Sequence, residues 1–404
     1  MNDIIHTARF YGLQTGFQPI ISIKRKTVIG FEALTRGMAG NSQAPVTYEA
    51  LHEMAEKQER LASFDSACQY SALQEWHAYR ALFPEALLFI NFDVALINSD
   101  LKGYRKFVAM IESAGLSPGS IVIELVEQKA EQEENLLFFV EICRRDGFLL
   151  AIDDFGEAFS NLERLFLIQP DIIKISKKLL HARRYSQEYG QSVLKGVAEL
   201  ISSIGAMPLL EGVEDMQQLS DAVDCNIDVI QGFLVSRPIF DLTDSAAAAV
   251  RESLIKTTDV AGMHRMQHIQ LGKIKSSYFM QEAKHISMII EMECVESDPD
   301  VVLSSWLHID EQIECMYLLS EKGIQITETH FGKICKVKNA LFRPARKGDD
   351  HSEKDYFLYI KAGSPHYYSP PYISQATGSL CITISVYLSR GPLSGTILCI
   401  DFRS

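Results

Sequence analysis

The 404-residue sequence lacks the features that mark membrane-embedded and nucleic-acid-binding proteins. Its longest apolar runs, such as Leu136–Val140 and Leu380–Leu388, are too short to cross a bilayer as helices. Acidic residues outnumber basic ones by 52 to 39, and the formal charge of −13 argues against binding to DNA, RNA or an anionic membrane surface. The first residues, MNDIIH, contain neither a basic nor an apolar segment, so we predict no secretory signal and a cytoplasmic location.

Several common site motifs are also missing. The 8 cysteines include no CxxC pair, which argues against a zinc cluster and predicts reduced, mostly buried thiols. His264 and His268 are spaced for one helix face, but the segment lacks the glutamate of a zinc-protease motif, so we expect a solvated face there. The sequence has no P-loop, GxGxxG or GxSxG pattern.

What the sequence does have is a regular alternation of strand and helix patterns over residues 14–240. This alternation predicts a parallel sheet, and about eight strands over roughly 225 residues favour an α/β fold of the closed (β/α)8 TIM type. The turn Ser22–Thr27 is too short for a helical crossover, so we predict an antiparallel first strand. The predicted strands are Gly16–Ile23, Val28–Leu34, Leu87–Asn91, Ile121–Leu125, Phe148–Asp153, Asp171–Ile175, Met207–Glu211 and Val229–Leu234. The clearest helical patterns are Tyr48–Phe64, Asp65–Leu82, Leu101–Ser113, Asn135–Arg145 and Glu188–Ile204.

The pattern changes after Pro238. The pattern of residues 241–294 predicts helices with breaks near Thr257–Val260 and at Gly272, and we interpret this segment as a linker. Residues 295–404 read as a small α+β domain. We therefore predict a barrel domain over 1–240, a helical linker over 241–294 and a third region over 295–404. The strands expected in this last region are Ile313–Leu319 paired with Ile324–Thr329, Phe357–Ile360, Leu380–Leu388 and Gly395–Phe402.

Polar side chains collect at the carboxyl ends of the predicted barrel strands. In a (β/α)8 barrel those ends meet on one face, where the chemistry of such barrels is built. So many carboxylates in one place cannot all stay ionised without cations, and oxygen ligands select Mg²⁺, Mn²⁺ or Ca²⁺. Two adjacent carboxylates allow one to bridge two metals, an arrangement suited to displacement at phosphorus. The residues are Glu32, Asn91, Glu124, Asp153, Asp154, Lys174, Glu211 and Gln231.

Eight motifs in order make residues 17–240 resemble the EAL domain family of cyclic-di-GMP phosphodiesterases. They are FQPI (17–20), FEALTR (31–36), IN (90–91), ELVE (124–127), DDFG (153–156), PDIIKI (170–175), EGVE (211–214) and QGF (231–233). The resemblance implies a (β/α)8 barrel with an antiparallel first strand. It also implies hydrolysis of one phosphodiester bond of cyclic di-GMP, which gives linear pGpG, with two Mg²⁺ or Mn²⁺ ions.

The resemblance further implies a role for each matching residue. Glu32, Asn91, Glu124 and Asp153 would hold one metal, while Asp153, Asp154 and Glu211 would hold or orient the second. Lys174 would lie against the attacking water or the departing oxygen. Arg36 would clamp a phosphate, and Gln18 and Gln231 would contact the substrate or order the site. Glu127 would brace the loop after Asp154, and Glu214 would support the turn at Glu211.

The chain departs from the family pattern near the two adjacent aspartates. Glu157 and Ala158 replace a Thr-Gly pair, Ser176 replaces an aspartate, and Arg237 replaces a common lysine. The first two changes favour an alternative: an EAL domain with weak or no turnover that acts as a cyclic-di-GMP receptor. A third alternative, a glycosidase built on a carboxylate pair, is disfavoured by the Asn91, Lys174 and Glu211 arrangement.

Residues 354–388, which contain the segment YYSPPYIS, resemble the PAS/Cache family of sensor domains. This resemblance implies a small cytosolic ligand, still unknown, or a role in dimerisation, with the 241–294 helices acting on the barrel. We predict a homodimer in bacterial signal transduction. The aromatic residues of this region suit either a ligand pocket or ordinary packing, and packing is the simpler interpretation. They are Tyr356, Phe357, Tyr359, Tyr367, Tyr368 and Tyr372.

Overall fold

The computed structural model describes residues 7–8, 12–38, 45–93, 102–126, 133–157, 162–181, 187–307, 310–333, 335, 338–339 and 341–403. The chain divides into two units, residues 1–268 and 269–404. This division falls inside a helix, whereas the sequence predicts boundaries at 240 and 294. The three-part organisation therefore stays a prediction, and the two units are described separately.

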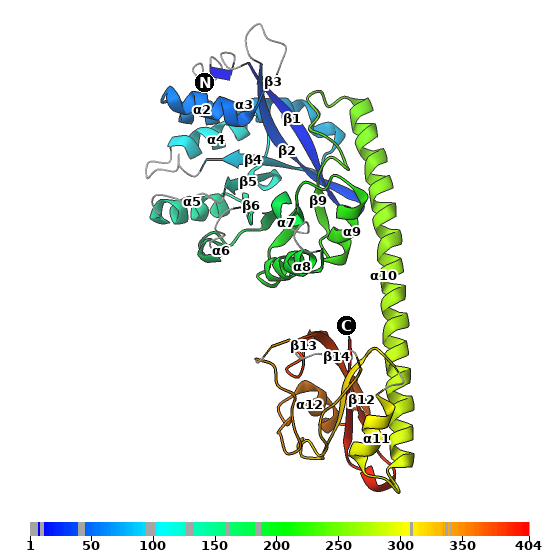
Figure 1. The fold of residues 1–404 in the computed structure, drawn as a ribbon. Coiled ribbons are helices and arrows are strands. Elements are labelled where there is room, and N and C mark those ends of the chain that lie inside the picture. The colour runs from blue at the N-terminus through cyan, green and yellow to red at the C-terminus, as the bar shows by residue number, and fades with distance from the viewer. Residues whose placement is uncertain are drawn as a thin grey trace. The chain divides into compact units, whose positions relative to one another are not determined.

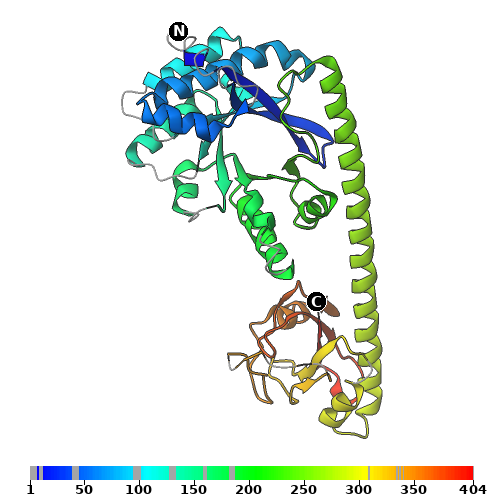
Figure 2. The same cartoon turned by 45° about the horizontal axis from the view of Figure 1, so that its top comes forward.

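In the first unit, strands of the described chain close into a ring (Figures 1 and 2). The first strand pairs antiparallel with both of its neighbours, and the remaining ring pairings are parallel, as the sequence predicts. The ring strands are β1 (Leu13–Ser22), β2 (Thr27–Met38), β4 (Leu87–Phe92), β5 (Ile121–Val126), β6 (Leu149–Phe155), β7 (Ile172–Ile175), β8 (Met207–Leu210) and β9 (Val229–Gln231); the short β3 (Pro45–Val46) pairs with β2.

Helices alternate with these strands along the chain. They are α2 (Tyr48–Lys57), α3 (Leu61–Tyr79), α4 (Lys102–Ser113), α5 (Glu133–Arg145), α6 (Leu162–Ile168), α7 (Lys177–His181), α8 (Gln187–Ser203) and α9 (Met216–Asp224). The sequence predicts the boundary between α2 and α3 after Phe64, whereas in the structure α3 already begins at Leu61. Glu59 explains the shift, because its φ of 57° is left-handed backbone and cannot continue a helix. At α9, Asp215 and Gln218 form a capping box that fixes the helix start.

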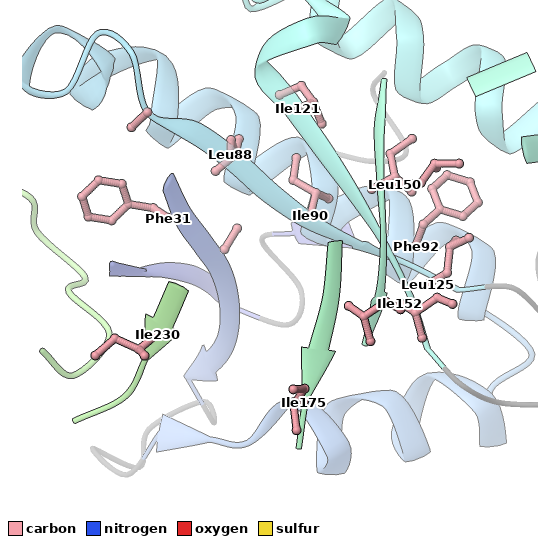
Figure 3. Packing of buried hydrophobic residues seen from close by; sticks show 14 of the residues in the cluster. Phe31, Leu88, Ile90, Phe92, Ile121, Leu125, Leu150, Ile152, Ile175 and Ile230 are labelled. Atoms are coloured by element: carbon pink, nitrogen blue, oxygen red, sulfur yellow. The ribbon is translucent and has the colours of Figure 1, made fainter. Parts of the chain in front are cut away.

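Each strand divides its side chains between the barrel interior and the surrounding helices. The interior holds one apolar layer with a residue from most strands: Ile20, Phe89, Val122, Ala151, Ile172, Leu209 and Val229. The alternate residues, such as Leu88, Ile90 and Phe92, point outward (Figure 3). Phe92 packs there on the rings of Phe107 in α4 and Phe139 in α5. This alternation with a period of two residues is the ordinary geometry of a strand.

One long helix, α10 (Asp244–Glu293), follows the barrel. The predicted breaks near Thr257–Val260 and at Gly272 are wrong, because the helix runs through both. Thr257 and Thr258 are buried, and packing outweighs the small helix-propensity cost of such residues. Within the described residues, no helix combines the length and apolarity that a bilayer crossing requires.

The second unit contains an antiparallel sheet in the order β11-β10-β15-β14-β12, with β13 paired to β14. Two strand predictions fail here. Phe357–Ile360 lies in a helix, because Tyr356, Phe357 and Ile360 form one buried helical face. Ile324–Thr329 follows β10 but makes only an isolated bridge to it through Gln325. The elements are α11 (Pro299–Trp306), β10 (Ile313–Leu319), β11 (His330–Phe331), α12 (Asp355–Lys361), β12 (His366–Tyr368), β13 (Tyr372–Ile373), β14 (Leu380–Tyr387) and β15 (Ile397–Arg403).

Candidate functional site

The polar residues of the candidate site stand two positions beyond the apolar interior layer. Since residues i and i+2 of a strand share a face, these side chains also point into the barrel. The strand pairs are Phe89 and Asn91, Val122 and Glu124, Ala151 and Asp153, Ile172 and Lys174, and Val229 and Gln231; Glu211 follows Leu209 just after β8. The structure therefore brings residues from six separate chain segments to one end of the barrel.

Lys174 lies at the centre of this group. Its side chain is 0% exposed, although a lysine is rarely buried without partners. Its Nζ lies 2.8 Å from Glu124 Oε1, 2.8 Å from Asp153 Oδ1, 2.9 Å from Glu211 Oε1 and 3.2 Å from Glu32 Oε1. One buried cation thus holds carboxylates from four segments.

The two adjacent aspartates both reach the site because β6 is irregular there. The register between β6 and β7 shifts between Ile152 and Phe155. Asp154 has a φ of 54°, a left-handed conformation that is strained for a residue with a Cβ. In a regular strand Asp153 and Asp154 would face opposite sides. The irregularity instead places both carboxylates in one group with Glu211.

The electrostatics of the site reflect burial and crowding of like charges. Burial, opposed by Lys174 and reinforced by Glu32 and Asp153, raises the pKa of Glu124 well above its ordinary value. Burial raises the pKa of Glu211, and burial with the neighbouring Asp153 raises the pKa of Asp154 to about 6. Burial alone would lower the pKa of Lys174, but the surrounding carboxylates outweigh it and raise that pKa. The site therefore carries more negative charge than one lysine compensates.

The carboxylates form two sets that fit divalent cations. Glu32, Glu124 and Asp153 offer oxygens within 4.8 Å of one another, as do Asp153, Asp154 and Glu211. Glu124 Oε2 is buried and makes no hydrogen bond to any described residue. An oxygen-only donor set is the chemistry that Mg²⁺, Mn²⁺ and Ca²⁺ prefer. Asp153 belongs to both sets, so the residues fit a pair of ions that share one ligand.

A chain of amides contacts Glu32, one member of the first carboxylate set. Gln231 Nε2 donates to Glu32 Oε2 at 2.6 Å and also lies 3.2 Å from Gln18 Oε1. Gln18 Nε2 donates to the backbone oxygen of Ser236 at 3.1 Å. In the described structure Gln231 contacts Glu32 directly and Gln18 contacts Gln231, while the roles expected for the two amides stay predictions.

The remaining predicted residues form no ion pair with Lys174 in the described part of the chain, or they lie outside it. Asn91 is half-buried beside Glu124 in the β4–β5 register. Arg36 is half-buried on the same face of β2 as Glu32, and its guanidinium contacts only the oxygen of Thr35 among described residues. Glu214 is exposed, and its backbone N–H donates to Gln218. Glu127 and Ala158 lie outside the described residues.

Sequence reasoning missed a contact between two of the departures from the family pattern. Ser176 Oγ donates to Glu157 Oε1 at 2.9 Å, and Lys178 Nζ lies 2.9 Å from the other oxygen of that carboxylate. These bonds outweigh burial and lower the pKa of Glu157. The sequence signal for this contact was that positions 157 and 176 both depart from the family pattern. His264 also differs from expectation, because it is half-buried and its Nε2 lies 2.8 Å from Asp224.

Known proteins are similar to this chain in sequence and in fold. This chain is 24% identical over 356 residues to the uncharacterized EAL-domain containing protein YkuI of Bacillus subtilis, covering 85% of this chain and 82% of YkuI. It is 23% identical over 256 residues to the probable cyclic di-GMP phosphodiesterase PdeI of Escherichia coli, covering 62% of this chain and 32% of PdeI. This chain therefore spans about a third of PdeI.

Two solved structures extend the comparison. The crystal structure of YkuI in complex with substrate cyclic di-GMP and calcium matches with a TM-score of 0.78 at 20% identity, over 100% of this chain and 99% of that one. Klebsiella pneumoniae BlrP1, in a manganese and cyclic-di-GMP complex, matches with a TM-score of 0.50 at 25% identity over 56% of each chain. Residues 7–238, more than half of the sequence and the whole of the candidate site, match the EAL domain, and the chain belongs to the EAL domain family.

Proposed function

We propose that this chain hydrolyses cyclic di-GMP to linear pGpG in a reaction that needs two divalent metal ions. The observation that carries the proposal is the position of Asp153, whose carboxylate belongs to both groups of converging acids. A shared ligand of this kind is typical of paired-metal sites that act on phosphodiesters. The solved complexes of YkuI and BlrP1 contain cyclic di-GMP together with calcium or manganese. They support the choice of cyclic di-GMP as substrate and of a divalent ion.

The acids of the site would bind the metal ions, and Lys174 would stabilise negative charge in the reaction. Glu32, Asn91, Glu124 and Asp153 would hold one ion, and Asp153, Asp154 and Glu211 the other, with Mg²⁺ or Mn²⁺ as the proposed metals. Bound ions would lower the pKa of a coordinated water and neutralise charge on the phosphate. The surrounding carboxylates raise the pKa of Lys174, so Nζ would carry a proton, and its positive charge would stabilise the negative charge that develops during displacement.

Other side chains would position the substrate. Arg36 has no ion pair with a described residue and stands at the carboxyl end of β2, so its guanidinium is available for a phosphate. Gln18 and Gln231 keep Glu32 oriented. Glu214 and Glu127 keep the supporting roles that the family resemblance implies.

The second unit would regulate the barrel. We propose that its residues 295–404 form a PAS/Cache-like sensor domain and that α10 carries the influence of this domain in a cytoplasmic homodimer. Its antiparallel sheet with flanking helices supports a small ligand-binding domain. The receptor alternative is favoured by one observation: Glu157, which contacts Ser176 and Lys178, follows the two adjacent aspartates after Phe155 and Gly156. A constrained loop there would permit binding with slow turnover.

One assay separates these functions. The purified chain is incubated with cyclic di-GMP over a range of Mg²⁺ and Mn²⁺ concentrations, and pGpG release and nucleotide binding are both measured. Metal-dependent release supports the enzyme, while binding without release supports the receptor. Glu124→Gln should lower the rate at least about 100-fold, since it removes a charged ligand of the first metal set. Glu112→Gln, on the exposed surface of α4, is the matched control, and equal rates for the two variants would reject the metal assignment.

A further inference from the structure

The second unit contains a cavity of about 420 Å³ that the proposed reaction does not use. It lies among β10, β13, β15 and the start of α12, entirely within residues 317–401. Its volume falls in the range of sites for small molecules. Tyr317, Tyr356, Tyr367 and Tyr372 supply its aromatic walls. Such walls favour a ligand with an apolar or aromatic body.

Two cations stand at the more exposed part of the lining. Arg343 is exposed and Lys354 is half-buried, and neither forms an ion pair with a described residue. Lys354 Nζ donates to Gln375 Oε1 at 3.1 Å. The exposed acids Glu353 and Asp355 also line the cavity but do not engage these cations. Arg343 and Lys354 therefore remain available to a carboxylate, which a guanidinium binds through paired hydrogen bonds.

The buried part of the lining presents hydrogen-bond acceptors. Asp401 is 3% exposed, and its Oδ1 accepts from Thr383 Oγ1 at 2.6 Å. Because a threonine hydroxyl has one proton, the 2.6 Å contact between Tyr372 and Thr383 must be donated by the phenol. The proton order Tyr372 to Thr383 to Asp401 leaves lone pairs on the Tyr372 oxygen and on Asp401. This part of the cavity therefore calls for a donor group.

A histidine in the same lining has an unused nitrogen. His351 is 7% exposed, and its Nδ1 lies 2.7 Å from the hydroxyl of Tyr356. Its Nε2 is buried and has no hydrogen-bond partner among the described residues. Leaving such an atom unpaired costs free energy, so a buried polar atom of this kind usually has a partner. A polar group of a bound molecule would supply one.

We propose that this cavity binds a small carboxylic acid that carries an amino or hydroxyl group and an apolar body. Its carboxylate would pair with Arg343 and Lys354, and its donor group would face Tyr372 and Asp401. Its apolar body would lie among the tyrosine rings. The inference concerns the second unit alone and does not depend on hydrolysis in the barrel.

Four probes that share a phenylalkyl body test the assignment on the full-length chain by titration calorimetry. L-Phenylalanine has a carboxylate and an amine, 3-phenyllactate a carboxylate and a hydroxyl, 3-phenylpropionate only the carboxylate, and 2-phenylethylamine only the amine. Phenylalanine or phenyllactate should bind at least roughly tenfold tighter than the two probes that lack one group. Equal affinity for all four, or binding of none, would overturn the proposal.

Variants then locate the carboxylate. Arg343→Gln should weaken the preferred probe roughly tenfold, because it removes a charged donor at an exposed position of the cavity lining. Lys347→Gln makes the same charge change on the same segment, outside the cavity lining, and should leave binding unchanged. Circular dichroism confirms that both variants are folded. If Arg343→Gln binds the probe as well as Lys347→Gln does, the carboxylate position is wrong.

Discussion

The acids at the barrel end and Asp401 of the second unit are buried in different ways. At the barrel end, Glu32, Glu124, Asp153 and Glu211 all contact the single cation of Lys174. In the second unit, Asp401 contacts no cation within 4.0 Å among the described residues and accepts hydrogen bonds from Thr383 and Cys315 instead.

The difference shows how a metal site is distinguished from an ordinary buried acid. Each oxygen of Asp401 accepts one hydrogen bond from a neutral donor, and the side chain has no excess of neighbouring acids that would call for a divalent ion. The barrel acids exceed their one counter-charge, and this excess negative charge attracts divalent ions. Local charge balance is therefore more informative than the number of acids.

The largest effect is expected from removing the barrel cation. Lys174→Met should lower the free energy of unfolding by about 3–5 kcal/mol without divalent metal, because it leaves buried carboxylates uncompensated. Calcium or magnesium should restore part of this loss, since an ion that binds only the folded state stabilises it. Urea unfolding in EDTA and in each metal measures both effects.

The control for this variant is Lys195→Met, which removes an exposed lysine of α8 that lies 3.9 Å from Glu199. It should change stability by less than about 0.5 kcal/mol, with or without metal. Equal losses in Lys174→Met and Lys195→Met would contradict the role of Lys174 as counter-ion.

The next effect concerns Asp401, where burial raises the pKa from 3.8 to about 6. The folded state then binds this proton more tightly than the unfolded state, so the stabilising contribution is complete below about pH 4 and is lost as pH rises to about 6. The loss amounts to about 3 kcal/mol. The native chain should therefore lose stability relative to Asp401→Asn across this interval.

Fluorescence of Trp306 reports unfolding of the second unit in a Trp76→Phe background, because the chain has 2 tryptophans and the other is Trp76. Parallel pH dependences of unfolding for the native residue and Asp401→Asn would contradict the assignment.

A smaller effect tests the strain beside the metal-binding acids. Asp154→Gly should raise the free energy of unfolding by about 1 kcal/mol, because glycine adopts the left-handed backbone at φ 54° without steric cost. The same change removes a proposed ligand and should lower metal-dependent turnover. Glu59→Gly relieves a similar φ of 57° on an exposed turn and should stabilise without affecting turnover. A stability gain in Glu59→Gly but not in Asp154→Gly would argue against strain at the site.

The smallest effect belongs to Glu157, an acid of the barrel that the neutral donor Ser176 and the cation of Lys178 both contact. Ser176→Ala removes the bond to Glu157 and should cost about 0.5–1 kcal/mol. Unlike the Lys174→Met loss, this cost should not depend on divalent metal. Ser202→Ala, an exposed serine of α8 that donates to Ala198, is the control in the same unfolding assay. A metal-dependent cost would place Glu157 within the metal site.

Much of the barrel could be predicted because its pattern is local. A strand alternates its faces, so an apolar residue such as Val122 inside the barrel places Glu124 inside as well. The short turn after β1 likewise predicts its antiparallel pairing. The secondary structure of the second unit is harder to predict from the sequence. Phe357–Ile360 suits a strand by composition, but packing selects helix α12, and the continuous α10 also exceeds what local propensities predict.

The barrel, and the acids expected at the carboxyl ends of its strands, could be predicted from the chain alone, because the alternation of side chains along a strand follows from neighbouring residues. The tertiary structure alone decided that Lys174 contacts four of those acids and that Asp153 and Asp154 share a face. It also decided that Ser176 holds Glu157 and that four tyrosines line one cavity. These facts depend on contacts between distant segments and on one irregular strand, which no local pattern specifies.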